Sequence, residues 1–280
     1  MTQSMKKPVT ILFVFLLMSL IPFSCSSHNK SKAPSIAVTT SYLECAARDI
    51  MGNDVNIVRL VPPGICPGHF DIAPGIIKEL KNCKVLLRFD FQNGMDEKVR
   101  AIAPKTLTIL AIPAPAGLCI PESYLQVLEI SHKGLCATFP EQIVTYDDNL
   151  KNAQTLIKAL EIDSKKRIRE TSLDSVKVIA SGHQSFFSKW LGLDVVAEYS
   201  GADSTSPLAL QTLLDNKTNS EVRFVIANLQ EGGQMGNAIA SRLGVPLVVF
   251  SNFPSMTPDE HDYFSLFRNN LNKLLASQQK

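Results

Sequence analysis

VKVIASGHQSFFSKWLGLDVV, residues 176–196, places two short apolar runs on either side of a helical pattern. Residues 176–180 and 194–198 have the apolar, β-branched composition of buried strands, and residues 185–191 have the spacing of an amphipathic helix. A strand, a helix and a second strand in this order form the repeating unit of a parallel sheet with crossover helices. This stretch therefore predicts an α/β fold.

The same alternation continues on both sides of this unit. A helix predicted over 149–170 separates two halves, which we expect to be two lobes, each with a mainly parallel sheet and flanking helices, with a cleft between them. In the first half the expected strands are 36–40, 55–61, 84–89 and 107–112, and the expected helices are 42–51, 76–80 and 95–102. In the second half the further strands are 222–227 and 245–250, and the further helices are 207–214, 235–243 and 259–275.

The expected domain organisation follows from these patterns. An N-terminal α/β lobe covers 36–146, a linking helix covers 147–172 and a C-terminal α/β lobe covers 173–280. Asp147 and Asp148 suit the start of the linking helix, because carboxylates cap exposed N–H groups and favour the positive end of the helix dipole.

The first 25 residues have the pattern of an export signal. Lys6 and Lys7 precede a short apolar run at 9–21, which is followed by Ser24 and Cys25. A cysteine after a small residue at this point predicts cleavage and lipidation of Cys25. Residues 26–35 are then a flexible tether, in which His28 is expected to be inert. Plain cleavage and an uncleaved anchor are the alternatives, and all three place the folded part outside the cytoplasm. Lipidation anchors it to a bacterial membrane in the periplasm or at the cell surface.

Composition excludes some classes of function. The 280-residue chain has 28 Lys and Arg against 26 Asp and Glu, a net charge of +2, so a nucleic-acid partner is not expected. No GxSxG or other nucleophile motif is present, and we expect a monomeric protein that is not an enzyme. Most of the remaining cysteines are expected to be small buried hydrophobes; they are Cys45, Cys66, Cys83, Cys119 and Cys136.

The ligand site is expected where the strands end. In open parallel sheets ligands bind outside the carboxyl ends of the strands. The loops at those ends include 62–74, 181–184, 228–233 and 251–258, and three histidines lie in or next to them: His69, His183 and His261.

Three segments resemble a known family, the zinc/manganese-type (cluster A-I) substrate-binding proteins of ABC importers. They are SIAVTTSYLECAARDIMGNDVNIVRLVPPGICPGHFDIAPGIIKELKNCKVLL (35–87), the stretch 176–196, and SRLGVPLVVF (241–250) followed by FRNNLNKLL (267–275). The resemblance implies that His69 is the first metal ligand and His183 the third. It also implies a membrane permease as partner.

Two of the four ligand positions depart from the family pattern. Alignment on Asn149 places Gln142 at the second position, and Ser251-Asn252 stands where the family has a carboxylate. Other side chains are therefore candidates to complete the shell: Cys66, Gln142, His132, Asn252, Asp259, His261 and Glu231. Asp71 is expected to orient the loop or a ligand histidine, and Phe186, Phe187 and Trp190 are expected in the core.

The resemblance implies an extracytoplasmic binding protein that captures a transition-metal ion in the cleft and delivers it to an importer. Few carboxylates and two histidines favour Zn²⁺ over Mn²⁺. Two alternatives remain open. The missing ligands are also compatible with a bound metal chelate or corrinoid, for which a wider aromatic-lined cleft is the discriminating feature, and with a degenerate surface-anchored adhesion or interaction module.

Overall fold

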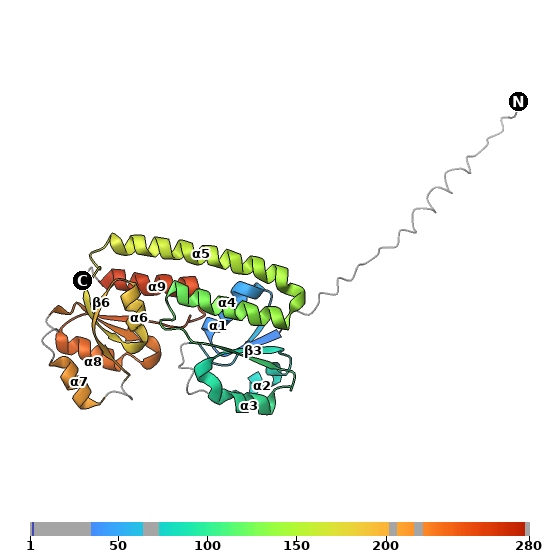
Figure 1. Ribbon diagram of the computed structural model, residues 1–280, viewed down its shortest axis with the longest axis horizontal. Coiled ribbons are helices and arrows are strands. Elements are labelled where there is room, and N and C mark those ends of the chain that lie inside the picture. Colours follow the sequence, from blue (N-terminus) through green and yellow to red (C-terminus); the bar gives the residue numbers. More distant parts are fainter. Residues whose placement is uncertain (1, 3–34, 64–72, 202–205, 216–220, 278–280) are drawn as a thin grey trace. The chain divides into compact units, whose positions relative to one another are not determined.

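The computed structural model describes residues 2, 35–63, 73–201, 206–215 and 221–277. Two parallel four-stranded sheets form the framework (Figure 1), so the α/β architecture is confirmed. The first sheet has the order β2-β1-β3-β4 and the second has the order β6-β5-β7-β8. The two orders are the same, so the two lobes repeat one topology although residue identity shows no repeat. Among the described residues no helix is both long enough and apolar enough to cross a bilayer.

The elements of the first lobe follow the predicted alternation closely. Its strands are β1 (Ser35–Val38), β2 (Asn56–Arg59), β3 (Val85–Phe89) and β4 (Thr108–Ile112). Its helices are α1 (Ser41–Met51), α2 (Pro74–Leu80), the short 3-10 turn η2 (Asp90–Met95) and α3 (Asp96–Ile102). The register pairs Ala37 with Leu86 and Val38 with Leu87, so β1 lies at the centre between β2 and β3.

Two helices connect the lobes, whereas the sequence pattern predicts one. They are α4 (Pro121–Thr138) and α5 (Ile143–Arg169), joined by the 3-10 turn η3 (Pro140–Gln142). The helix α4 was not predicted, although Tyr124, Val127, Leu128 and Leu135 are buried at helical spacing. The 27 residues of α5 extend the helix predicted over 149–170 to about 40 Å. Asn149 lies inside α5 and does not open a helix.

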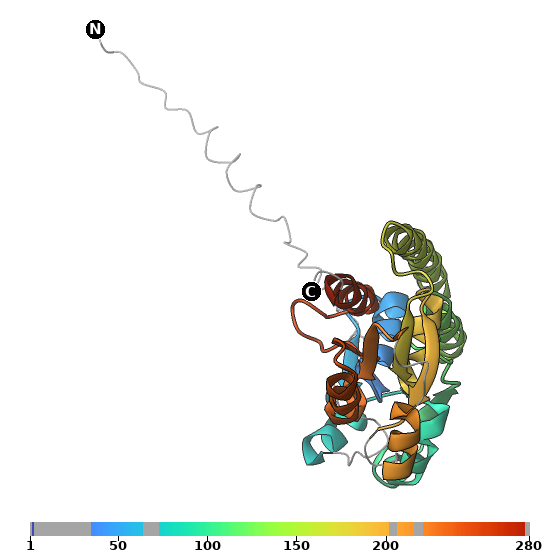
Figure 2. The ribbon, with the colours of Figure 1, turned by 90° about the vertical axis from the view of Figure 1, so that its left-hand side faces the viewer.

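The second lobe contains the remaining elements. Its strands are β5 (Lys177–Ser181), β6 (Asp194–Tyr199), β7 (Phe224–Asn228) and β8 (Leu247–Phe250). Its helices are α6 (Gly182–Trp190), α7 (Pro207–Leu214), the 3-10 turn η5 (Leu229–Glu231), α8 (Gln234–Leu243) and α9 (Tyr263–Ala276). Figure 2 looks at this lobe and shows helices on both sides of its strands.

Alternation along the strands divides the buried residues into clusters. Val178 and Ala180 of β5 face a cluster that includes α6 and α9, while Ile179 between them faces α7 and α8. Residues of β1 divide in the same way: Ile36 and Val38 face α1, α4 and α5, and Ala37 faces α2 and α3. The cluster on the α1, α4, α5, α6 and α9 side is shared by both lobes. One continuous core therefore joins the lobes, with a smaller cluster on the outer face of each sheet.

The cysteines follow the expectation in part. Cys45, Cys83 and Cys119 are buried and free, as expected for small hydrophobes, whereas Cys136 is free but partly exposed. Cys25 and Cys66 lie outside the described residues.

Candidate functional site

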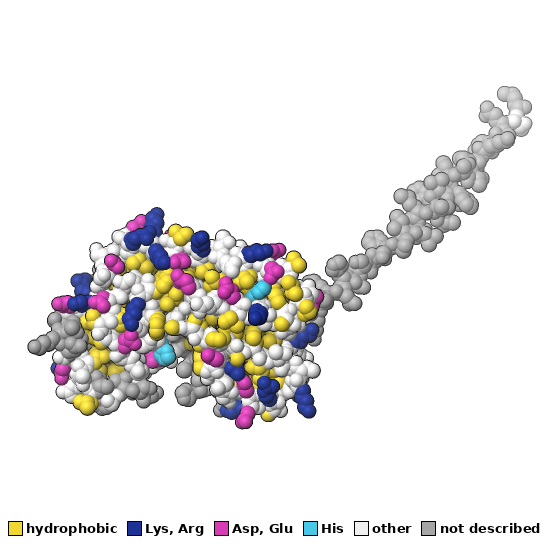
Figure 3. Space-filling view, in the orientation of Figure 1, with side chains coloured by type: hydrophobic (Ala, Val, Ile, Leu, Met, Phe, Trp, Pro, Cys, Tyr) yellow, Lys and Arg dark blue, Asp and Glu magenta, His cyan; other side chains and the backbone are white. Residues whose placement is uncertain are grey.

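A cavity of about 330 Å³ lies between the two lobes and is lined by residues of both. Space-filling Figure 3 shows a hollow between the lobes with histidine surface beside it. The described lining residues are Phe91, residues 114–118, Gly182, His183, Phe186, Asn228, Gln230, Glu231, Asn252 and Phe253. These residues come from loops at the carboxyl ends of β3, β4, β5, β7 and β8, where a parallel sheet is expected to bind its ligand.

His183 stands at the beginning of α6, directly after β5. The helix begins there because Ser181 caps it, its Oγ accepting the backbone N–H of His183 at 3.3 Å. The His183 side chain is 66% exposed, and its Nε2 lies 3.6 Å from Oε1 of Glu231. The structure therefore brings together two of the candidate ligands, an imidazole nitrogen and a carboxylate oxygen.

Glu231 reaches the cavity from the end of η5, the turn that follows β7. Its second oxygen, Oε2, accepts a short hydrogen bond from the hydroxyl of Ser181. Ser181 thus holds both partners, through the His183 backbone and the Glu231 carboxylate. Such outer hydrogen bonds orient ligands before an ion arrives.

The neighbouring carboxylate of Glu198 is committed elsewhere. Its Oε1 accepts hydrogen bonds from Ser185 Oγ at 2.5 Å and from Lys189 Nζ at 3.0 Å. These two hydrogen bonds hold the pKa of Glu198 below its usual range. Among the described lining residues, Glu231 and His183 are the titratable groups.

Asn252 lines the cavity, but its side-chain oxygen already has partners. Gln184 donates from Nε2 to Oδ1 of Asn252 and to Oδ1 of Asn228, both at 3.0 Å. The Asn252 backbone N–H is bound in turn by Oε1 of Gln230 at 2.9 Å. This neutral amide network fixes the wall of the cavity and leaves Asn252 a weaker candidate than Glu231.

Aromatic side chains form much of the remaining wall. Phe91 is 53% exposed and Phe186 is 55% exposed, and both line the cavity together with Phe253. Phe187 is fully buried as expected, but Phe186 is not a core residue, because successive side chains of a helix point about 100° apart and Phe186 turns toward the cavity. The expectation for Phe186 was therefore wrong.

The first lobe contributes no titratable group to the described lining. Its loop after β4, Ala114–Leu118, is apolar and carries Gly117 at a positive φ of 71°. This loop is not among the strand-end loops named from the sequence, which are 62–74, 181–184, 228–233 and 251–258. The carboxyl end of the strand predicted at 107–112 points to this loop as part of the ligand site.

The other candidate residues lie apart from the cavity or outside the described residues. Gln142 ends η3 and is not among the residues that line the cavity. Asn149, on which the alignment rests, lies in α5 and donates to the Ile50 carbonyl at 2.9 Å. His261 contacts the Pro258 carbonyl at 3.1 Å, and neither it nor Asp259 lines the cavity. His132 contacts Asp147 and Cys136 on α4 and α5. His69, Cys66 and Asp71 fall in 64–72, outside the described residues.

Known proteins resemble this protein both in sequence and in fold. The family described as "Zinc-uptake complex component A periplasmic" matches residues 120–277. Manganese ABC transporter substrate-binding lipoproteins PsaA of Streptococcus mitis and Streptococcus pneumoniae are each 20% identical to the chain, over 312 and 314 residues. These alignments cover 98% and 99% of this chain and 100% of each relative.

Solved structures show the same fold. The Mn-bound periplasmic metal binding protein from Candidatus Liberibacter asiaticus superposes with a TM-score of 0.73 at 16% identity, covering 87% of this chain and 98% of that one. A crystal structure of ZnuA has the same TM-score and identity, covering 88% of this chain and 99% of that one.

Proposed function

We propose, because the chain belongs to the family of periplasmic zinc-uptake components A, that it captures a transition-metal ion in the cavity between its lobes. The protein is thus the periplasmic metal-binding component of an ABC metal transporter, a transport protein and not an enzyme. Its partner is the membrane permease of that transporter. We further propose that it binds the permease as a monomer.

The pairing of His183 with Glu231 carries this proposal. A tetrahedral zinc ion bonded at 2.0–2.2 Å holds a nitrogen and an oxygen ligand about 3.4 Å apart. Nε2 of His183 and Oε1 of Glu231 are separated by 3.6 Å, so an ion fits between them with little movement. We propose that His69, from the loop of the first lobe, supplies a third ligand across the cavity.

The balance of donors favours zinc over manganese. With two imidazoles and one carboxylate, the proposed set is richer in nitrogen than the oxygen sets that Mn²⁺ prefers. Relatives and structural neighbours include manganese-, cadmium- and zinc-named proteins, so the family alone leaves the metal open.

Metal-dependent thermal stabilisation tests the site. At a hundredfold excess over the dissociation constant, Zn²⁺ is expected to stabilise the wild type by about 2.7 kcal/mol, and more than Mn²⁺ at equal concentration. His183→Ala, Glu231→Gln and His69→Ala are each expected to remove most of the rise in melting temperature. The matched control is His261→Ala, since that side chain is also 66% exposed but lies outside the cavity lining. A full zinc response in His183→Ala contradicts the proposal.

The aromatic wall supports a second candidate, a metal chelate. Phe91 and Phe186 expose flat surfaces that suit a planar organic ligand better than a bare ion. Zinc–phenanthroline is a suitable probe, because it presents both a metal and an aromatic plane. The chelate is favoured if the protein binds this complex more tightly than free Zn²⁺ and if Phe186→Ala removes the difference in affinity. Equal or weaker binding favours the free ion.

Lipid anchoring is a separate proposal that rests on the sequence. The apolar run at 9–21 and the Ser24-Cys25 pair favour lipidation of Cys25, and the streptococcal relatives are named lipoproteins. Cys25→Ser is expected to release the protein from membranes into the soluble extracytoplasmic fraction. Retention of the variant after a carbonate wash argues for an uncleaved apolar anchor instead.

A further inference from the structure

A second group of metal-ligating side chains lies on α4 and α5. His132 and Cys136 are one turn apart on α4, and Asp147 is in the first turns of α5 beside them. One ligand atom from each residue lies within 4.8 Å of the other two. None of the three lines the cavity. The lining loop 114–118 precedes α4, which begins at Pro121, and His132 lies 11 residues further along this helix, about 16 Å from its start.

Both neighbours converge on the same histidine atom. Nε2 of His132 is 2.8 Å from Oδ1 of Asp147 and 3.4 Å from Sγ of Cys136. A ring nitrogen of neutral imidazole has either one proton or one lone pair, so it cannot serve the thiol and the carboxylate equally. An ion between the three atoms binds all of them at once.

The distances are close to those that a metal requires. With bonds of 2.0–2.1 Å to nitrogen and 2.3 Å to sulfur, a tetrahedral ion keeps these two ligands about 3.5 Å apart. The observed separation of Nε2 and Sγ is 3.4 Å. The carboxylate of Asp147 has to move back by about 0.6 Å, from a hydrogen-bonding distance of 2.8 Å to the 3.4 Å typical of two ligands.

Accessibility distinguishes Cys136 from the other described cysteines. Cys45, Cys83 and Cys119 are buried, whereas Cys136 is partly exposed. The side chains of His132 and Asp147 are 18% and 46% exposed, so an ion can enter from solvent. Burial and the Asp147 carboxylate raise the pKa of the Cys136 thiol, and a bound cation offsets both by favouring the thiolate.

We propose that His132, Cys136 and Asp147 form a second transition-metal site, separate from the cavity and contained in the two helices, α4 and α5, that connect the lobes. Nitrogen, sulfur and oxygen donors with one open position suit Zn²⁺ and its spectroscopic substitute Co²⁺, with water as the fourth ligand. On binding, the Cys136 thiol would release its proton to solvent; Nε2 of His132, Sγ of Cys136 and a carboxylate oxygen of Asp147 would hold the ion, and the imidazole would keep its proton on Nδ1. The ion ties α4 to α5.

Cobalt absorption tests the site, because a thiolate bound to Co²⁺ produces an intense near-ultraviolet charge-transfer band. Reduced full-length protein is titrated with Co²⁺, and folding of each variant is checked by its thermal melt. We expect the band in the wild type, its loss in Cys136→Ser, and at least about tenfold weaker Co²⁺ binding in His132→Gln and Asp147→Asn. Added Zn²⁺ is expected to abolish the band.

Three control variants separate this site from its surroundings. Asp148→Asn changes the next carboxylate, which is 71% exposed and pairs with Lys151, and is expected to leave the band unchanged. His183→Ala also retains the band, so failure of the cavity site and failure of this site are distinguishable. Cys66→Ser removes the other candidate thiolate ligand and is expected to retain the band. Absence of the band in the wild type, its persistence in Cys136→Ser, or its loss in Cys66→Ser overturns the proposal.

Discussion

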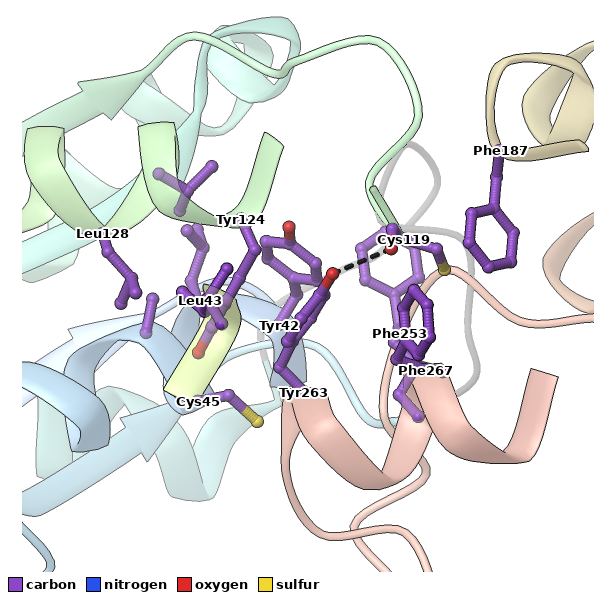
Figure 4. Close-up of a cluster of buried hydrophobic side chains, with 14 of the residues drawn as sticks. Tyr42, Leu43, Cys45, Cys119, Tyr124, Leu128, Phe187, Phe253, Tyr263 and Phe267 are labelled. Atoms are coloured by element: carbon purple, nitrogen blue, oxygen red, sulfur yellow. Dashed lines mark hydrogen bonds between the residues drawn. The ribbon is translucent and has the colours of Figure 1, made fainter. Parts of the chain in front are cut away.

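The floor of the cavity and its rim differ in burial and in hydrogen bonding. We use the name floor for four buried residues behind the cavity lining, Cys119, Ser251, Tyr263 and Asn270; none of them lines the cavity, but Cys119 follows the lining residue Leu118 and Ser251 precedes the lining residue Asn252. Hydrogen bonds between the two lobes join them, and Figure 4 shows the one between Tyr263 and Cys119. The rim, which we define as Phe91, His183 and Phe186, is more than half exposed. The lobes are therefore held together beneath the site, while the side chains above it remain free to contact a ligand.

Hydrogen bonds across the floor are numerous for so few residues. Asn270 donates from Nδ2 to the Ser251 carbonyl at 2.8 Å and to Cys119 Sγ at 3.3 Å, and its Oδ1 accepts the Ser251 N–H at 3.0 Å. The Cys119 thiol donates to the same carbonyl at 3.0 Å, and burial raises its pKa to about 12, so it stays a neutral donor. Tyr263 stacks on Tyr124 with ring centroids 3.8 Å apart.

This difference separates stability from binding. A buried polar network is costly to break, because each orphaned group has lost its water as well as its partner. An exposed side chain can be changed with little effect on folding. Floor substitutions should therefore change stability in the metal-free protein, and rim substitutions should change ligand binding alone.

The largest effect is expected for Asn270→Ala in the floor. It removes three hydrogen bonds and leaves the buried Ser251 N–H and carbonyl without this partner, a loss of about 3 kcal/mol of unfolding free energy. Urea denaturation measures it. The matched control is Asn269→Ala, which removes the hydrogen bond at 3.0 Å from Nδ2 of Asn269 to the Glu260 carboxylate and is expected to cost less, about 1.5 kcal/mol. Equal losses of unfolding free energy in Asn270→Ala and Asn269→Ala would contradict the special role of the floor in stability.

Gly117→Ala tests the junction between floor and rim. Gly117 has a φ of 71°, and an added Cβ would lie 2.6 Å from Cδ1 of Ile120 and 3.0 Å from Cβ of Phe186. Strain and crowding together are expected to cost about 2 kcal/mol and to shift Phe186. Gly94→Ala is the control, since a Cβ there meets nothing within 4 Å. If Gly117→Ala has the same melting temperature as Gly94→Ala, the predicted strain is absent, and the loop 114–118 must be able to move away from Phe186 on α6.

Tyr263→Phe removes a single floor hydrogen bond. The hydroxyl donates to the Cys119 carbonyl at 2.8 Å between the lobes, and its loss is expected to cost about 1 kcal/mol while ring stacking on Tyr124 is kept. Urea unfolding measures the change, and zinc affinity serves as the second readout. Unchanged stability combined with weaker zinc binding would place this residue functionally with the rim.

The smallest effect on folding is expected for Phe186→Ala at the rim. Its ring is 55% exposed, so the metal-free protein should lose no more than about 0.5 kcal/mol. Leu208→Ala, which is 73% exposed in α7 and does not line the cavity, is the control. A stability loss in Phe186→Ala as large as that in Asn270→Ala removes the distinction between rim and floor.

The local patterns predicted most of the fold. Alternation and apolar runs identified all eight described strands to within a few residues, because strands covered by helices carry a run of apolar residues at their centre. The helix α4 was missed, although its Tyr124, Val127, Leu128 and Leu135 repeat with helical spacing. Gln142, which the sequence placed at the second ligand position, lies at the end of η3 and does not line the cavity.

By itself the sequence determined the fold class, the family and the place of His183 directly after a strand, since each depends on short-range pattern and motif. Only the tertiary structure decided that Glu231 faces His183, that Phe186 borders the cavity, and that Asp147 meets His132 and Cys136. It also showed that one core joins the two lobes. These relations connect residues from different elements, and their approach depends on how whole helices and sheets pack, which no local periodicity specifies.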